Sequence, residues 1–299
     1  MPANTAPPRF FICLGAQKAG TTWLAQQLRA HPEFSLPPHK ELGYFDSFYT
    51  GSFERVRQKK LVRLAENLNG LAESDESLSQ AQASNLRWQA NYAIVARDGY
   101  DDQWYWSLFR DLDPEKVTGD FSPNYSLLPE EGIRHMKVCA PHAKLFFILR
   151  NPVERTWSGA LYALRKQIQK KKEIPSARRI RAATLSAIQR SFSDYRKIIQ
   201  SYEGVFGSNS LNFLFYDDLK SDPLGFLQTF CEMNDVGFDA AWFKGVNKRI
   251  NEGPSVEKNP QILAEIAKSS MEQLEWLAQR FGTVAQAWKR DAEAFLENQ

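Results

Sequence analysis

Short apolar runs alternate with amphipathic stretches along this chain. Runs at 10–14, 117–121, 144–149 and 211–215 predict strands, and a shorter run at 42–45 predicts a strand or an extended segment. Helices are predicted at 21–30, after Pro129, after Pro152 and at 182–202. Strands that alternate with helices are typical of an α/β fold, with a central, mostly parallel sheet and helices on both faces.

One domain accounts for most of the 299 residues. We predict a disordered N-terminal tail at 1–8 and a single domain at 9–299. Residues 47–103 keep no period for long and predict a helical insertion over the sheet. Residues 250–299 predict a C-terminal loop followed by helices with an apolar docking stripe at Leu263, Ile266, Leu274, Leu277 and Phe281.

Two glycines, Gly15 and Gly20, bound the loop between the first strand and the first helix. In such a loop, backbone N–H groups and the positive end of the helix dipole converge, which suits a phosphate or sulfate group. The P-loop of nucleotide hydrolases has a lysine directly after the second glycine. Here Thr21 occupies that position and the lysine is Lys18, so the fold is P-loop-like while an ATPase or kinase is disfavoured.

A second anion site is predicted where the strand at 144–149 ends in Arg150. Nucleotide hydrolases usually have an aspartate for Mg²⁺ at the comparable place, so a phosphate bound directly, without metal, is expected. Asn151 is a good N-cap and Pro152 suits the first helical position. Ser158 lies two turns after the cap on the same face, so its hydroxyl and Arg150 could hold one phosphate.

Two segments resemble sulfotransferases that use 3′-phosphoadenosine 5′-phosphosulfate (PAPS). Residues 17–23, QKAGTTW, resemble their 5′-phosphosulfate loop, and residues 150–158, RNPVERTWS, resemble their 3′-phosphate motif. The resemblance implies transfer of a sulfuryl group from PAPS to a hydroxyl or amine, without metal and with the 3′,5′-bisphosphate PAP as product. It also implies these nucleotide-binding residues: Lys18, Gly20, Thr21, Thr22, Arg150 and Ser158. Lys18 would in addition be catalytic and neutralise charge on the leaving group.

A looser resemblance concerns the catalytic base. Residues 40–46, KELGYFD, look like a segment of heparan-type and bacterial sulfotransferases in which the glutamate is the base, which implies that role for Glu41. His39 and Asp120 are substitute candidates, and a simple ion pair is the alternative for Glu41. At the position of Phe121 other family members carry a lysine or histidine. Phenylalanine cannot act as a base, which favours Glu41 as the base. Arg249 and Lys258 are weaker candidates for contact with the nucleotide from the late loop.

Charge and composition limit the partners. The net charge of +3 implies no general affinity for nucleic acid. Between Arg165 and Arg181, however, there are eight basic residues and one acid. This run is either a solvated face or an attraction site for an anionic acceptor. The acceptor itself, a small molecule, a sugar or a lipid, is not determined by the sequence, and neither is the oligomeric state.

Three scattered cysteines form no metal-ligand pattern and predict buried, reduced thiols. No run approaches the ~18 to 20 apolar residues of a membrane span, and the N-terminus lacks the features of a signal peptide. We therefore expect a cytoplasmic enzyme. Two other functions remain open at this point: a P-loop nucleotide kinase and a non-catalytic nucleotide-binding module.

Overall fold

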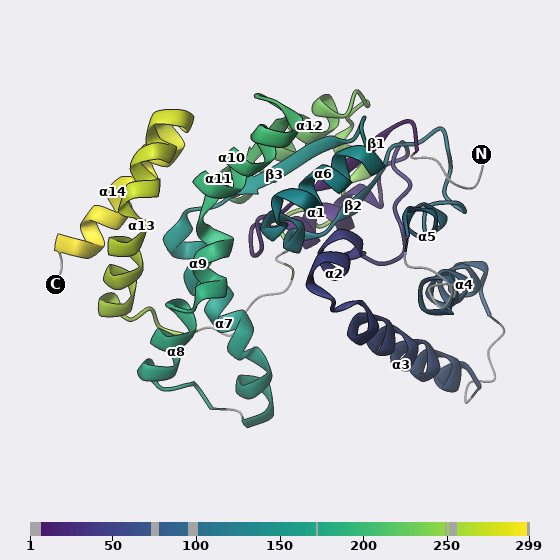
Figure 1. Ribbon diagram of the computed structural model, residues 1–299, viewed down its shortest axis with the longest axis horizontal. Coiled ribbons are helices and arrows are strands. Elements are labelled where there is room, and N and C mark those ends of the chain that lie inside the picture. Colours follow the sequence, from purple (N-terminus) through teal and green to yellow (C-terminus); the bar gives the residue numbers. More distant parts are fainter. Residues whose placement is uncertain are drawn as a thin grey trace.

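The computed structural model describes residues 7–72, 78–94, 101–171, 173–248, 250 and 256–297. Four parallel strands form one sheet in the order β2-β1-β3-β4 (Figure 1). The strands are β1 (Phe10–Cys13), β2 (Thr118–Phe121), β3 (Lys144–Leu149) and β4 (Leu211–Phe215). The predicted α/β fold with a parallel sheet is confirmed, and so are the four strands at these positions.

Fourteen α-helices surround the sheet in the described part of the chain. They are α1 (Thr21–Leu28), α2 (Tyr44–Thr50), α3 (Phe53–Ala72), α4 (Gln80–Ile94), α5 (Asp102–Ser107), α6 (Glu130–Cys139), α7 (Pro152–Lys171), α8 (Ala177–Thr184), α9 (Ala187–Ser193), α10 (Tyr195–Phe206), α11 (Tyr216–Ser221), α12 (Pro223–Met233), α13 (Pro260–Phe281) and α14 (Thr283–Glu297). Two short 3₁₀ helices lie at Pro123–Leu127 and Ala240–Trp242. Figure 1 shows α3 and α4 at one end of the molecule and α13 and α14 at the other.

The predicted strand or extended segment at 42–45 is wrong. Helix α2 begins at Tyr44, directly after Gly43, whose φ of 67° turns the chain. Tyr44, Phe45 and Ser47 are buried, so the apolar positions follow a helical rather than an alternating period. A four-residue apolar run does not distinguish the two, because either element can bury it.

The single helix predicted at 182–202 is also wrong, because the structure has α8, α9 and α10 there. Ser186 precedes α9, and Asp194 separates α9 from α10. The Asp194 carboxylate accepts a hydrogen bond of 3.1 Å from the backbone N–H of Lys197 and so caps α10. Serine and aspartate side chains favour such caps over helix interiors, and this local preference breaks the long period.

Aromatic side chains fill the core beneath the sheet. Phe11, in the central strand β1, is fully buried and makes edge-to-face contacts with four other rings: Phe34, Phe121, Phe146 and Phe230. The two central strands are in register, with Cys13 opposite Phe146. Because β1 and β3 are parallel neighbours, the loop after β1 and the residues after β3 emerge side by side at one edge.

The predicted domain boundaries stay a prediction. Within the predicted insertion at 47–103, α3 and α4 are described, while 73–77 and 95–100 lie outside the described residues, as do positions 1–6 of the predicted tail. In α13 the apolar stripe is confirmed, since Leu263, Ile266, Leu274 and Leu277 are buried and Phe281 packs against the core. The three cysteines are buried and unpaired, as predicted.

Candidate functional site

The loop between β1 and α1 is anchored to β3 at its start. The backbone N–H groups of Leu14 and Ala16 donate to the carbonyls of Phe146 and Ile148, both at 2.9 Å. The chain then turns at Gly20, which has φ of 87° and caps α1 without any side-chain hydrogen bond. The first N–H groups of a helix have no partner inside it, so those around Thr21 and Thr22 can receive an anion.

Gly20 is required by packing as well as by its backbone conformation. A Cβ at this position would lie 2.7 Å from Cδ1 of Leu219 in α11. A side chain there would therefore have to push the Leu219 side chain aside and would also be strained at positive φ. The glycine lets the loop lie directly against α11.

Lys18 is a half-buried cation without an anionic partner. It has φ of 70°, and its Nζ lies 4.7 Å from the centroid of the Tyr162 ring in α7. Burial lowers the pKa of the ammonium, and the positive charges of Arg150, Arg165 and Lys40 lower it further. No carboxylate of the described residues lies within ion-pair distance of it, so an anionic ligand would stabilise the charged ammonium.

Arg150 joins the two predicted anion sites. It follows β3, and its Nη1 donates a hydrogen bond of 2.7 Å to the carbonyl oxygen of Lys18. Its guanidinium lies over the ring of Tyr216, 4.6 Å from the centroid, and 3.7 Å from Glu154. The two sites are therefore adjacent at the carboxyl edge of the sheet.

Helix α7 presents one face to the loop. Asn151 caps it as predicted, accepting a hydrogen bond of 3.0 Å from the N–H of Val153. Residues four apart share a helix face, so Glu154, Ser158 and Tyr162 lie in line. Glu154 contacts Arg150 and Tyr162 contacts Lys18, which puts the half-buried Ser158 between the two anion sites. Its predicted role in phosphate binding stays a prediction.

Glu41 is held by its backbone while its carboxylate faces solvent. Its backbone N–H donates a hydrogen bond of 3.1 Å to the carbonyl oxygen of Phe121, at the carboxyl end of β2. Its φ is 63°. The side chain is 61 % exposed and forms an ion pair of 2.9 Å with Lys40. The alternative of a simple ion pair is therefore realised in this structure. An exposed carboxylate can still receive a proton, and its assignment as the base stays a prediction.

The backbone after Glu41 is fixed by three hydroxyl groups. Tyr92 donates a hydrogen bond of 2.6 Å to the carbonyl of Leu42. Ser122 accepts from the N–H of Gly43 at 3.3 Å, and Tyr125 accepts from the N–H of Tyr44 at 3.0 Å. This segment is consequently positioned by contacts from distant parts of the chain.

Asp120, a substitute candidate for the base, lies behind that segment and is 1 % exposed. Its carboxylate accepts hydrogen bonds from Ser122 at 2.6 Å, Tyr125 at 2.7 Å and Tyr105 at 3.1 Å. Burial raises the pKa of Asp120 to about 6, and the three hydroxyl donors limit the rise. Such a carboxylate is out of reach of a substrate and supports the hydroxyls that hold residues 43 and 44.

The buried Asp120 makes stability depend on pH. A carboxyl whose folded pKa lies above its unfolded value stabilises the fold at low pH, and this stabilisation is lost as pH rises through about 6. As pH rises from 4 to 7, the free energy of unfolding of Asp120→Asn is therefore expected to increase by roughly 3 kcal/mol relative to that of wild type, because the folded pKa of about 6 lies above the unfolded value. Urea unfolding of both proteins across this range measures it. A difference that is constant with pH would contradict the assignment.

His39, the other substitute, points away from the loop. Its Nε2 lies 3.1 Å from Oδ1 of Asn85, and its ring packs against Trp88, both in α4. Burial lowers the pKa of His39 to about 4, helped by the charges of Lys60 and Arg63. Phe121 is likewise buried in the core against Phe11 and contributes no polar group.

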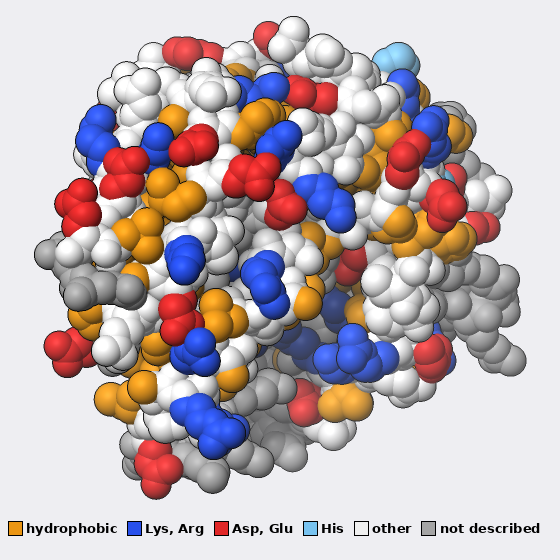
Figure 2. Space-filling model, turned by 60° about the vertical axis from the view of Figure 1, so that its left-hand side comes forward, with side chains coloured by type: hydrophobic (Ala, Val, Ile, Leu, Met, Phe, Trp, Pro, Cys, Tyr) orange, Lys and Arg blue, Asp and Glu red, His pale blue; other side chains and the backbone are white. Residues whose placement is uncertain are grey.

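Two described residues of the basic run have different surroundings. Arg165 lies at the loop beside Tyr162, whereas Arg181 pairs with Glu265 of α13 at 2.7 Å. The side chains of Lys170 and Lys171, and all of Lys172 and Arg249, lie outside the described residues. Lys258, a weaker candidate, contacts Glu154 rather than an open site. Figure 2 shows a hollow in the surface with Lys and Arg side chains around it.

Three residues beside the loop were not predicted as site residues: Tyr162, Arg165 and Tyr216. Tyr162 could have been found from its spacing, because it follows Ser158 by four residues and so shares its helix face.

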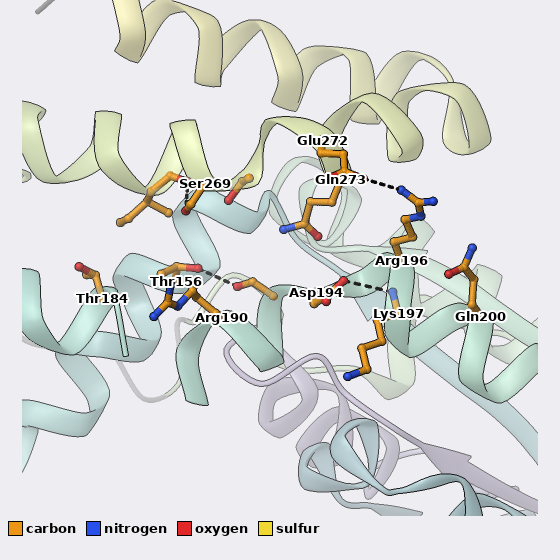
Figure 3. A pocket seen from close by; sticks show the side chains of 13 residues that line it. Thr156, Thr184, Arg190, Asp194, Arg196, Lys197, Gln200, Ser269, Glu272 and Gln273 are labelled. Atoms are coloured by element: carbon orange, nitrogen blue, oxygen red, sulfur yellow. Dashed lines mark hydrogen bonds and ion pairs between the residues drawn. The ribbon is translucent and has the colours of Figure 1, made fainter. Parts of the chain in front are cut away.

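A separate cavity of about 480 Å³ lies between α9, α10 and α13 (Figure 3). It is lined by polar side chains such as Arg196, which pairs with Glu272 at 3.0 Å, and by none of the loop residues.

The described residues contain neither a metal-binding cluster nor a membrane-spanning helix. No group of His, Cys, Asp and Glu residues among them is arranged to hold a metal ion. None of their helices combines the length and apolar character needed to cross a bilayer.

The sequence matches a known protein family and several known proteins. Residues 8–240 match the model of a family described as "Sulfotransferase family". The chain is 25% identical over 148 residues to the "Membrane-associated sulfotransferase kil1" of Dictyostelium discoideum, covering 50% of this chain and 21% of that protein. It is 26% identical over 175 residues to "Carbohydrate sulfotransferase 15" of Homo sapiens, covering 52% and 27%. The matches thus span about a quarter of these relatives.

A solved structure supports the fold over nearly the whole chain. The crystal structure of a sulfotransferase from Alicyclobacillus acidocaldarius superimposes with a TM-score of 0.62 and covers 95% of this chain and 100% of that one. The sequence identity is 22%, so this likeness concerns the fold.

Proposed function

Because the chain belongs to the sulfotransferase family, we propose that it transfers a sulfuryl group from PAPS to a hydroxyl or amine of an acceptor. The observation that carries the proposal is the hydrogen bond of 2.7 Å between Arg150 and the Lys18 carbonyl. It brings the cation after β3 against the glycine loop after β1. One small nucleotide with phosphates at both its 3′ and 5′ positions can therefore reach both sites.

The donor set fits such a nucleotide. The Gly20 turn offers backbone N–H groups and a helix N-terminus, and Lys18 has no anionic partner among the described residues. In the proposal, Gly20, Thr21 and Thr22 hold the oxygens of the 5′-phosphate. Arg150 and Ser158 hold the 3′-phosphate, a geometry that suits the planar guanidinium.

The proposed reaction is an in-line displacement at sulfur. The acceptor oxygen forms a bond to sulfur, and the bond from sulfur to the bridging oxygen breaks, leaving its electron pair on the 5′-phosphate of PAP. Lys18 neutralises the charge that develops on this oxygen, and Glu41 takes the acceptor's proton. Positioning and electrostatic stabilisation do most of the work in the analogous phosphoryl transfers.

Two alternatives receive less support. A nucleotide kinase is disfavoured by Thr21 in the lysine position and by Arg150 where an aspartate for Mg²⁺ is usual. A non-catalytic nucleotide-binding module would share the cradle and lack a working base. The cytoplasmic location stays a prediction.

Calorimetric titration with PAP, and separately with ATP and Mg²⁺, tests the nucleotide assignment. We expect saturable, one-to-one binding of PAP and at least 10-fold weaker binding of ATP with Mg²⁺. In Arg150→Ala the affinity for PAP should fall about 10- to 100-fold, since a charge-assisted contact to phosphate is lost. Tighter binding of ATP with Mg²⁺ than of PAP would reject the proposal.

A further inference from the structure

The exposed ring of Tyr162 carries two cations. The guanidinium carbon of Arg165 lies 3.5 Å from the ring centroid, and the Nζ of Lys18 lies 4.7 Å from it. Arg165 also donates a hydrogen bond of 3.3 Å from Nη1 to the carbonyl oxygen of Tyr162. Cation–π contacts of this kind hold a cation in place without neutralising its charge.

Lys18 and Arg165 share this ring without an anion between them. No carboxylate in the described ranges is within ion-pair distance of either side chain, and the charge of Arg165 contributes to the lowered pKa of Lys18. Like charges near one another repel, and a bound anion would offset this repulsion. Both cations contact the same ring, so an anion that binds beside the ring can approach either of them.

The position of Arg165 along α7 identifies which part of the donor it would meet. Arg165 follows Arg150 by 15 residues, about 22 Å at the rise of an α-helix. Arg150 thus lies just before the start of α7, whereas Arg165 lies in the second half of this helix. Its contact with the same ring as Lys18, and its effect on the pKa of Lys18, bring it to the phosphosulfate end of the nucleotide.

We propose that Arg165, held on Tyr162, binds a non-bridging oxygen of the sulfuryl group and so selects PAPS over PAP. This inference rests on the proposed function and assigns a specificity-determining residue to it. In this proposal Lys18 neutralises the bridging oxygen, and Arg165 binds the sulfuryl group that is transferred. The contact involves no additional bond making or proton transfer.

Parallel titrations with PAP and with PAPS, without acceptor, test this role. In Arg165→Ala the affinity for PAPS is expected to fall about 10- to 100-fold, the size of one charge-assisted hydrogen bond, and that for PAP less than 2-fold. Tyr162→Leu, which removes the ring under the guanidinium, should weaken PAPS binding in the same direction. Arg165→Lys keeps the positive charge but loses the planar guanidinium, so its affinity for PAPS should lie between those of Arg165→Ala and wild type.

Arg178→Ala is the matched control, because Arg178 is exposed in α8 and belongs to the same basic run. It should leave both affinities unchanged. Equal losses for PAP and PAPS in Arg165→Ala, or no loss for either, would overturn the role of Arg165 while leaving the proposed function intact. Failure of the wild-type protein to bind either nucleotide would instead reject the proposed function. Thermal melts of each variant verify folding.

Discussion

Lys18→Met is expected to lower the rate of sulfuryl transfer about 100- to 1,000-fold at saturating donor, the usual effect of removing one preorganised charge. Methionine keeps the length of the side chain and its packing on Tyr162. It has no charge, however, so no cation would neutralise the oxygen of the leaving group. The affinity for PAP should change much less, because Arg150 and the loop N–H groups remain. Transfer of labelled sulfuryl groups from PAPS to acceptors in fractionated cell extract measures the rate, and calorimetry measures the affinity.

Lys268→Met is a suitable control for that measurement. Lys268 is exposed on α13, far along the chain from the loop, and its loss changes the net charge equally. Its transfer rate should equal that of wild type. A Lys18→Met protein with wild-type turnover at saturating donor would show that the leaving group is stabilised by another residue.

Glu41→Gln is expected to lower the transfer rate about 100- to 10,000-fold, the range for loss of general-base assistance. Glutamine keeps the shape of the side chain and removes the proton-accepting carboxylate. The backbone should not move, because the N–H of Glu41 and the groups of residues 42 to 44 are held independently of the side chain. Donor binding should be unchanged, and the same extract assay measures the rate.

Glu115→Gln provides the comparison, since Glu115 is exposed just before β2, at the opposite edge of the sheet. Its activity should match wild type. If Glu41→Gln keeps full activity, the ion pair with Lys40 is the only role left for Glu41, and another group must take the proton. If both Glu41→Gln and wild type bind PAP but transfer nothing, the non-catalytic module is the better description.

The glycine loop and Arg150 were readable from the sequence because each depends on local rules. A strand, two glycines and a helix define the cradle, and a strand end followed by Asn-Pro defines the position of the cation. Their adjacency comes from the parallel pairing of β1 and β3 in the structure. The two short-range interpretations that failed, at 42–45 and 182–202, fell where local patterns fit more than one element.

The surroundings of the candidate bases could not be read in the same way. Asp120 is held away from the loop by contacts such as its hydrogen bond with Tyr105 of α5. His39 is held away from it by Asn85 of α4. The pairing of Lys18 and Arg165 on Tyr162 depends on how α7 packs against the loop. Helical spacing shows that Ser158 and Tyr162 share a face, but it does not show which face meets the loop.

The close approach of α11 to the loop has a consequence for protein engineering. Leu219 and Tyr216 support Gly20 and Arg150 from a segment about 200 residues downstream of the loop. Transplanting the β1-loop-α1 unit alone into another parallel-sheet scaffold should therefore give a disordered turn. A chimera that also carries residues 211–221, with the strand that leads into α11, should keep the shape of the cradle.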